Sequence, residues 1–241
     1  MDRALLIAAA LAAGCYDPKF PSGGFACSSL NNFVCPDGLR CDQSAGLCVT
    51  VSAPDAMPGE VGCSDGSREA LRNRSMYPGI AACQGAWDRP GVVNATDGAH
   101  CNREAGNDGL IPDGSSCNVA DLCANGWHVC TDLADVANHM GGAGCGELST
   151  TANAIYVTRQ RGAALTGQCV LGTQAANNVY GCGSVGAVPA GGEGCAPLNR
   201  ELRINFGQCP LPWNCGSDDA NEGQNLIKAP GPGGALCCKD P

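Results

Sequence analysis

Nineteen cysteines in 241 residues constrain this chain more than any other feature of its sequence. Proteins of reducing compartments rarely carry so many thiols, whereas exported proteins often use them as disulfide staples. The number is odd, so at least one cysteine has no partner within the chain. The sequence therefore predicts an extracytoplasmic, disulfide-rich protein in which one cysteine has a separate role.

The N-terminus has the pattern of an export signal. After three residues come ten apolar ones, 4–13, a run too short to span a bilayer. The run leads into Gly14 and Cys15, and small residues before a cysteine resemble the lipobox of bacterial lipoproteins. The resemblance implies cleavage after Gly14 and acylation of Cys15, because several acyl chains together anchor a protein stably. The alternative is an ordinary secretory signal, cut at a nearby small residue.

The 18 cysteines other than Cys15 fall into two even groups of four and fourteen. A stretch without cysteine separates the groups and contains two prolines, as linkers often do. The first group lies in a segment too short to bury a core, which would depend on its disulfides. We expect five consecutive parts: a signal peptide at 1–14, a lipidated tether at 15–26, a small four-cysteine module at 27–48, a linker at 49–62 and a disulfide-stapled domain at 63–241.

Both cysteine groups are expected to be fully paired, although their spacing does not reveal the connectivity. The adjacent Cys237 and Cys238 are expected to bond to two different partners. The cysteines expected in disulfides are Cys27, Cys35, Cys41, Cys48, Cys63, Cys83, Cys101, Cys117, Cys123, Cys130, Cys145, Cys169, Cys182, Cys195, Cys209, Cys215, Cys237 and Cys238.

The large domain reads as an α+β, loop-rich fold preceded by a small disulfide knot. Its clearest helix is 131–140, where apolar residues recur at helical spacing between a capping Thr131 or Asp132 and the pair Gly141-Gly142. Further helices are expected at 67–74 and 117–123, and strands at 154–159, 178–182, 203–206 and 235–238.

Three histidines, His100, His128 and His139, are the candidates for a catalytic base. The sequence has no H-E-x-x-H motif, and pairing of the cysteines would leave no thiol nucleophile. Cys123 and Cys130 flank His128 and could ligate a metal, but zinc favours closer cysteine pairs, so a disulfide role is expected. We expect His139 on an exposed helix face, the tryptophan before His128 in the core, and no enzymatic activity.

Two loops, 107–115 and 217–222, are rich in side-chain oxygens. Calcium binds six to eight hard oxygens from carboxylates, amides and carbonyls, so such loops could hold it. Neither loop matches the EF-hand pattern, and Asn-Asp-Gly sequences also simply form turns. The calcium candidates are Asp108, Asp113, Asp218, Asp219 and Glu222, and no other cofactor is expected.

Short motifs of the sequence resemble two known families. The segment Leu122–Met140 is similar to the opening of bacterial C-type-lectin-like domains, and Trp213-Asn214-Cys215 resembles the Trp-Asn pair of animal C-type lectins. The lectin resemblance implies a fold only, because Cys215 replaces the calcium-ligating Asp and no Glu-Pro-Asn or Gln-Pro-Asp tripeptide occurs. Segments 63–73 and 229–238, among others, resemble cysteine-rich lipoproteins of myxobacteria and related bacteria, a family that implies a location but no known activity.

The acidic balance, a formal net charge of −9, argues against nucleic acid as a partner, because such binders need a basic face. We expect a protein held at the bacterial outer membrane by its lipid anchor, on the periplasmic or the surface face. Its stapled domain is expected to bind a glycan or a surface protein. The alternatives are a purely structural envelope component or an extracytoplasmic hydrolase.

Overall fold

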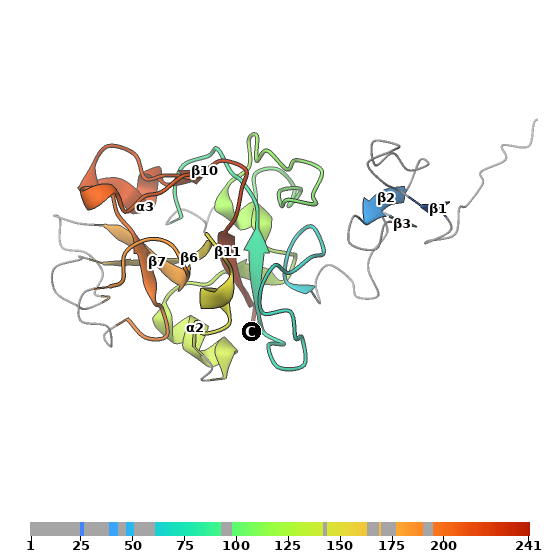
Figure 1. Cartoon of the computed structure of the whole chain (residues 1–241), viewed down its shortest axis with the longest axis horizontal. Coiled ribbons are helices and arrows are strands. Elements are labelled where there is room, and N and C mark those ends of the chain that lie inside the picture. The colour runs from blue at the N-terminus through green and yellow to red at the C-terminus, as the bar shows by residue number, and fades with distance from the viewer. Residues whose placement is uncertain are drawn as a thin grey trace, which may run out of the picture. The chain divides into compact units, whose positions relative to one another are not determined.

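A computed structural model describes residues 25–26, 39–42, 47–50, 61–92, 98–141, 144–162, 169, 177–189 and 195–241. The chain divides into two compact units, Met1–Ala53 and Pro54–Pro241 (Figure 1). The predicted signal peptide, the predicted lipidation site Cys15 and most of the predicted linker lie outside the described residues. Among the described residues, no helix has the length and apolar character needed to cross a bilayer.

The first unit contains a three-stranded antiparallel sheet. Its strands are β1 (Phe25–Ala26), β2 (Leu39–Asp42) and β3 (Leu47–Thr50), in the order β1-β3-β2. Cys48 on β3 is completely buried and disulfide-bonded. A disulfide-bonded cysteine is therefore the buried residue of β3, in a small unit with little apolar surface for a core.

The second unit is built on a mixed sheet around a central strand, β11. One edge of β11 pairs antiparallel with β4, and the other pairs parallel with β6 and antiparallel with β5 (Figure 1). The sheet continues from β6 through β7 to β8. Its strands are β4 (Ile80–Gln84), β5 (Trp127–Val129), β6 (Ile155–Gly162), β7 (Asn178–Gly183), β8 (Arg200–Leu202) and β11 (Gly234–Lys239).

The clearest predicted helix is confirmed as α2, Leu133–Met140. Asp132 caps it by accepting hydrogen bonds from the backbone N–H groups of Ala134 and Asp135, both at 2.9 Å. Gly141 ends it in the left-handed region, at φ 59°. The expected strands 154–159, 178–182 and 235–238 are confirmed within β6, β7 and β11.

The helix expected at 67–74 is wrong. Ala70 instead forms a bridge to Ala82, and the Glu69 N–H donates to the Ala82 carbonyl at 3.1 Å. Leu71 has a φ of 55°, which no right-handed helix accommodates. The buried Arg68 donates to backbone carbonyls, including that of Tyr77 at 2.9 Å. Tertiary pairing therefore overrides a locally helical pattern.

Two further expectations are corrected. The helix at 117–123 is shortened to the 3-10 helix η3, Val119–Leu122, which a capping box from Asn118 and Asp121 fixes. The strand expected at 203–206 lies earlier, as β8, because the Ile204 N–H bonds to a side chain rather than to a strand. The other short elements are η4 (Leu148–Thr150), η5 (Asn205–Gly207), β9 (Trp213–Asn214), η6 (Asp219–Asn221), α3 (Glu222–Asn225) and β10 (Ile227–Lys228).

Seven disulfides staple the second unit, so the α+β, disulfide-rich class is confirmed. Cys237 and Cys238 bond to two different partners, as expected, since successive residues of a strand face opposite sides of the sheet. Their partners are Cys123 and Cys130, which thus belong to separate bridges. The pairs are Cys63–Cys83, Cys101–Cys117, Cys123–Cys237, Cys130–Cys238, Cys145–Cys182, Cys169–Cys195 and Cys209–Cys215.

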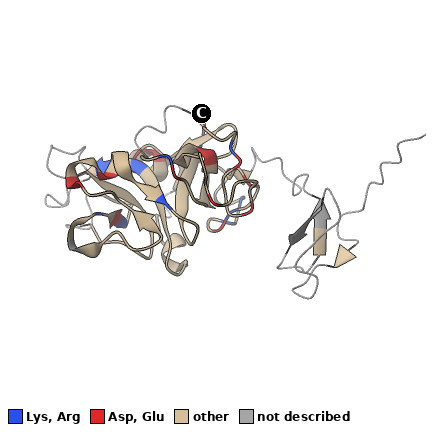
Figure 2. Ribbon diagram, turned by 90° about the horizontal axis from the view of Figure 1, so that it is seen from above, with Lys and Arg blue, Asp and Glu red and all other residues tan. Residues whose placement is uncertain are grey.

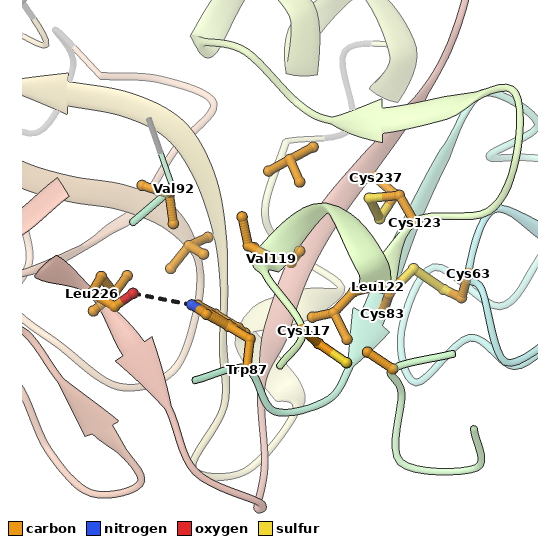
Figure 3. Close-up of a cluster of buried hydrophobic side chains, with 14 of the residues drawn as sticks. Cys63, Cys83, Trp87, Val92, Cys117, Val119, Leu122, Cys123, Leu226 and Cys237 are labelled. Atoms are coloured by element: carbon orange, nitrogen blue, oxygen red, sulfur yellow. Dashed lines mark hydrogen bonds between the residues drawn. A yellow bond between two sulfur atoms is a disulfide. The ribbon is translucent and has the colours of Figure 1, made fainter. Parts of the chain in front are cut away.

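The core has two clusters, one on each face of the sheet. Figure 3 shows part of the first, where Trp87 lies beside Val119 and Leu122 near two disulfides. The Trp87 indole N–H donates to the Leu226 carbonyl at 3.0 Å, which satisfies its polar atom (Figure 3). Trp127 is buried in the same cluster, as the sequence predicts.

Candidate functional site

A pocket of about 300 Å³ opens on the segment between β8 and α3. The disulfide Cys209–Cys215 closes this segment into a short loop, and β9 within it pairs antiparallel with β10. The Asn214 side-chain oxygen accepts from the Gly216 N–H at 2.9 Å, which fixes the turn after β9. The residues lining the pocket are Ile204, Gly207, Cys209, Leu211, Trp213, Asn214, Cys215 and Gly216.

Trp213 and Leu211 give the pocket its chemical character. Trp213 is only 2% exposed, packs edge-on against Trp87 at 5.5 Å, and has an indole N–H without a hydrogen-bond partner. Leu211 is 93% exposed, an unusual position for a leucine side chain. The pocket thus combines an exposed leucine side chain with a buried tryptophan, and small-ligand sites are typically lined by apolar and aromatic side chains.

A buried lysine supports the Trp213 ring. Lys228 Nζ lies 5.6 Å from the ring centroid and donates to the carbonyls of Gly85 at 2.9 Å and Gly231 at 2.7 Å. Burial lowers the pKa of Lys228 to about 7. Backbone carbonyls therefore hold the Lys228 amine beside the Trp213 ring.

The predicted calcium residues of the second loop are engaged locally. Asp218 caps η6 through the Ala220 N–H, and Asp219 accepts from the Asn205 side chain. Glu222 is 1% exposed and accepts from the Ile204 N–H. Burial raises the pKa of Glu222 to about 7. Calcium binding here stays a prediction, since the described residues of this loop bring no three carboxylates together.

The negative charge of the nearby Glu201 contributes to the raised pKa of Glu222. Glu201 is completely buried, accepts from Asn178 at 3.2 Å, and lies 3.3 Å from Arg203. Among the described residues, the second carboxylate oxygen of Glu222 has no hydrogen-bond partner. The Glu222 carboxylate is therefore poorly compensated when it is ionised.

In the first loop, the two aspartates play different parts. Asp113 is exposed, and hydrogen bonding from the Ser115 N–H lowers the pKa of its carboxyl. The Asp108 N–H donates to Asp65 Oδ2 at 3.3 Å, so this end of the loop meets an acidic residue from another part of the chain. Sequence reasoning missed Asp65, and with it Glu69. Asp65, Ser67 and Glu69 form the sequence D-x-S-x-E, and two of them, Ser67 and Glu69, lie in the segment 67–74 that was predicted to be a helix.

His128 lies between two carboxylates. Its Nδ1 is 2.7 Å from Asp240 and its Nε2 is 3.1 Å from Asp135. The hydrogen bond with Asp135, assisted by Asp240, raises the pKa of His128. Within the described residues, both ring nitrogens of His128 thus face carboxylates.

His139, expected to be exposed, is part-buried and lies 3.2 Å from the same Asp135. Two groups of metal-ligating residue types lie close together in the described part of the chain, one with Cys101 and Cys117 and one with Cys130 and Cys238. In each group the two cysteines form a disulfide, so they offer no thiolate to a metal.

Basic and acidic residues are intermixed in the described part of the second unit (Figure 2). In Figure 2, Lys and Arg of the described residues lie at several separate places among Asp and Glu. No protein-family model and no solved structure matches the chain.

Proposed function

We propose that this chain is an extracytoplasmic, lipid-anchored binding protein whose stapled domain recognises a glycan or a surface protein at the bacterial envelope. The pocket beside β9 carries the proposal, because it is lined by the exposed Leu211 and by Trp213, whose indole N–H has no hydrogen-bond partner among the described residues. A sugar ring has a C–H face for the leucine and oxygens that accept from the indole. A glycan could therefore interact with both Leu211 and the indole of Trp213. An apolar side chain of a protein partner would contact Leu211 alone.

The disulfides support the location. Seven bridges in the second unit indicate an oxidising, extracytoplasmic environment. Anchoring at Cys15 is the part of the proposal that rests on the sequence alone. Intact mass spectrometry should find an acylated Cys15 and the other 18 cysteines as nine disulfides. A mass without acyl groups would reduce the proposal to a secreted binding protein.

The binding test uses the intact exported protein against a glycan array and solubilised envelope proteins, with dissociation constants measured for any ligand found. The variant Trp213→Phe keeps an aromatic ring but removes the indole N–H. Loss of one hydrogen bond, worth about 1 kcal/mol, should weaken binding about fivefold. Leu211→Ser should weaken it about tenfold through lost apolar contact.

The matched control is Leu110→Ser. Leu110 is 76% exposed but does not line the pocket, so its replacement should leave binding unchanged. Equal affinity of the wild-type protein and both pocket variants would exclude this pocket as the site. The absence of any glycan or protein ligand would instead favour a purely structural envelope component.

A further inference from the structure

Asn125 and Gly126 form the one Asn-Gly pair in the sequence. Both residues are exposed, and they lie in the turn that connects η3 to β5. The Trp127 N–H donates to the Ala124 carbonyl at 3.1 Å and closes this turn, with Gly126 in the left-handed region at φ 78°. Residues with a side chain rarely adopt that conformation, so the turn itself favours glycine after the asparagine.

An asparagine followed by glycine can lose ammonia without an enzyme, and asparagine is among the thermolabile residues for this reason. The backbone nitrogen of the glycine bonds to the side-chain carbonyl carbon, the C–N bond of the side-chain amide breaks, and the proton of the glycine N–H leaves with the ammonia. Water then opens the resulting cyclic imide at either of its two carbonyls. The products are aspartate and isoaspartate, and in isoaspartate the main chain is one carbon longer.

The reacting groups of this pair are unoccupied. Among the described residues, neither the Gly126 N–H, the Asn125 carbonyl nor the Asn125 side chain takes part in a hydrogen bond. A Cβ added to Gly126 would meet no atom within 4 Å, so this side of the turn is open. The peptide between the two residues can therefore rotate and bring its nitrogen to the side-chain carbonyl of Asn125.

The Asp-Gly pairs that the structure describes in full are arranged differently. They could form the same imide by losing water, but in each of them the glycine N–H already donates to a backbone carbonyl. The distances are 3.1 Å for Gly66, 3.1 Å for Gly109 and 3.0 Å for Gly114. Their attacking nitrogens are thus held in place, whereas that of Gly126 is not.

We propose that Asn125 is a site of spontaneous deamidation, with water as the co-reactant, and that isoaspartate at this position releases the C-terminal end of the chain. The Gly126 carbonyl accepts from the Asp240 N–H at 2.9 Å, and Asp240 Oδ1 lies 2.7 Å from His128 Nδ1. An extra main-chain carbon before Gly126 moves its carbonyl away from Asp240. The hydrogen bond that fixes the residue after β11 is then lost.

The rest of the sheet should stay closed after this change. Cys123 and Cys130 lie on either side of the turn, and both are bonded to cysteines of β11. The disulfides therefore confine the effect to the turn and to the residues that follow β11. Neither Asn125 nor Gly126 lines the pocket beside β9, so a test of this site does not depend on the proposed binding function.

The test incubates the intact exported protein at pH 8 with its disulfides closed, then maps deamidation by digestion at acidic pH and mass spectrometry. We expect a mass gain of about one dalton at Asn125. It should appear at least about tenfold faster than at any other asparagine, because glycine does not obstruct the attacking nitrogen. Methylation by an isoaspartyl methyltransferase should identify isoaspartate in the same peptide.

Asn125→Gln should abolish the mass gain in this peptide, because glutamine would have to close a larger ring. The matched control is Asn73→Gln. Asn73 is also exposed, but its Oδ1 accepts from the Ser75 N–H at 3.1 Å, so its replacement should leave the reaction at Asn125 unchanged. A protein that deamidates first at another asparagine, or at Asn125 only after unfolding in urea, would overturn the proposal.

Hydrogen exchange tests the release of the C-terminal end. Conversion to isoaspartate should speed exchange of the Asp240 N–H about fivefold, as expected for the loss of one hydrogen bond. Asn125→Asp adds the same charge without the extra carbon and should leave this exchange unchanged. Equal exchange before and after conversion, or equally faster exchange in Asn125→Asp, would overturn the role assigned to the longer main chain.

Discussion

Replacing Glu222 with glutamine should stabilise this protein at alkaline pH and not at acidic pH. Glu222 begins α3, is 1% exposed, and has one carboxylate oxygen that accepts from the Ile204 N–H and another without a partner. Burial raises the pKa of Glu222 from 4.5 to about 7, and the charges of Asp219 and Glu201 contribute to this shift. Glutamine has nearly the same shape and carries no charge.

The magnitude follows from the shifted pKa. Between pH 4.5 and 7 the native state binds the Glu222 proton more tightly than the unfolded state does, so stability falls as the pH rises through this range. At about 1.4 kcal/mol for each pKa unit, the full loss at pH 8 is about 3 kcal/mol. Glu222→Gln avoids this loss, so the variant should exceed the wild type by up to about 3 kcal/mol at pH 8 and by less than about 1 kcal/mol at pH 4.5.

The assay is urea unfolding with the disulfides intact, at pH 4.5 and pH 8. Other titrating groups contribute equally to both proteins and cancel in the difference. Asp218→Asn is the control, because Asp218 is exposed and asparagine also caps a helix, so a change below about 0.5 kcal/mol is expected at either pH. An advantage of Glu222→Gln that is the same at both pH values would refute the reasoning.

Three further outcomes can be measured in the same way. His128→Gln should lower the free energy of unfolding by about 0.5–1 kcal/mol at pH 5.5 and by less at pH 8.5. A raised histidine pKa stabilises the native state at low pH, and this stabilisation is lost as the pH rises through the pKa. Equal losses at both pH values would exclude the ion pairs as the cause. Asp132→Ala should cost about 1 kcal/mol in urea unfolding through loss of the α2 cap, and Asp132→Ser should restore most of it. The double variant Cys123→Ala and Cys237→Ala opens a loop of 114 residues and should cost about 4–5 kcal/mol, so a loss under about 2 kcal/mol would contradict the loop-entropy estimate.

Elements determined by local sequence could be predicted, and α2 is the clearest example. Its cap at Asp132, its apolar spacing and its terminal Gly141 all lie within one short segment. The strand β4 was missed because both of its faces are buried, so Ile80–Gln84 shows no alternation of apolar and polar residues. The helix predicted at 67–74 was wrong for the opposite reason. Its local pattern is helical, but the segment pairs with β4 instead.

The candidate sites show the same division. The composition of a loop indicates that its side chains could bind a cation, but not which distant residues meet them. Asp108 and Glu222 were singled out from their own segments, whereas the contact of Asn107 with Asp65 and Glu69 depends on packing across the fold. The disulfide connectivity was unreadable for the same reason, because Cys123 and Cys130 find partners more than 100 residues away.

The position of β11 has a consequence for how the protein matures after export. The chain emerges from the export machinery in sequence order, so Cys123 and Cys130 reach the oxidising side long before their partners on β11. An oxidase that joins cysteines as they appear would link these two to each other or to earlier neighbours. Maturation of the protein should then depend on a disulfide isomerase, which reopens early, incorrect bridges once the last strand is available.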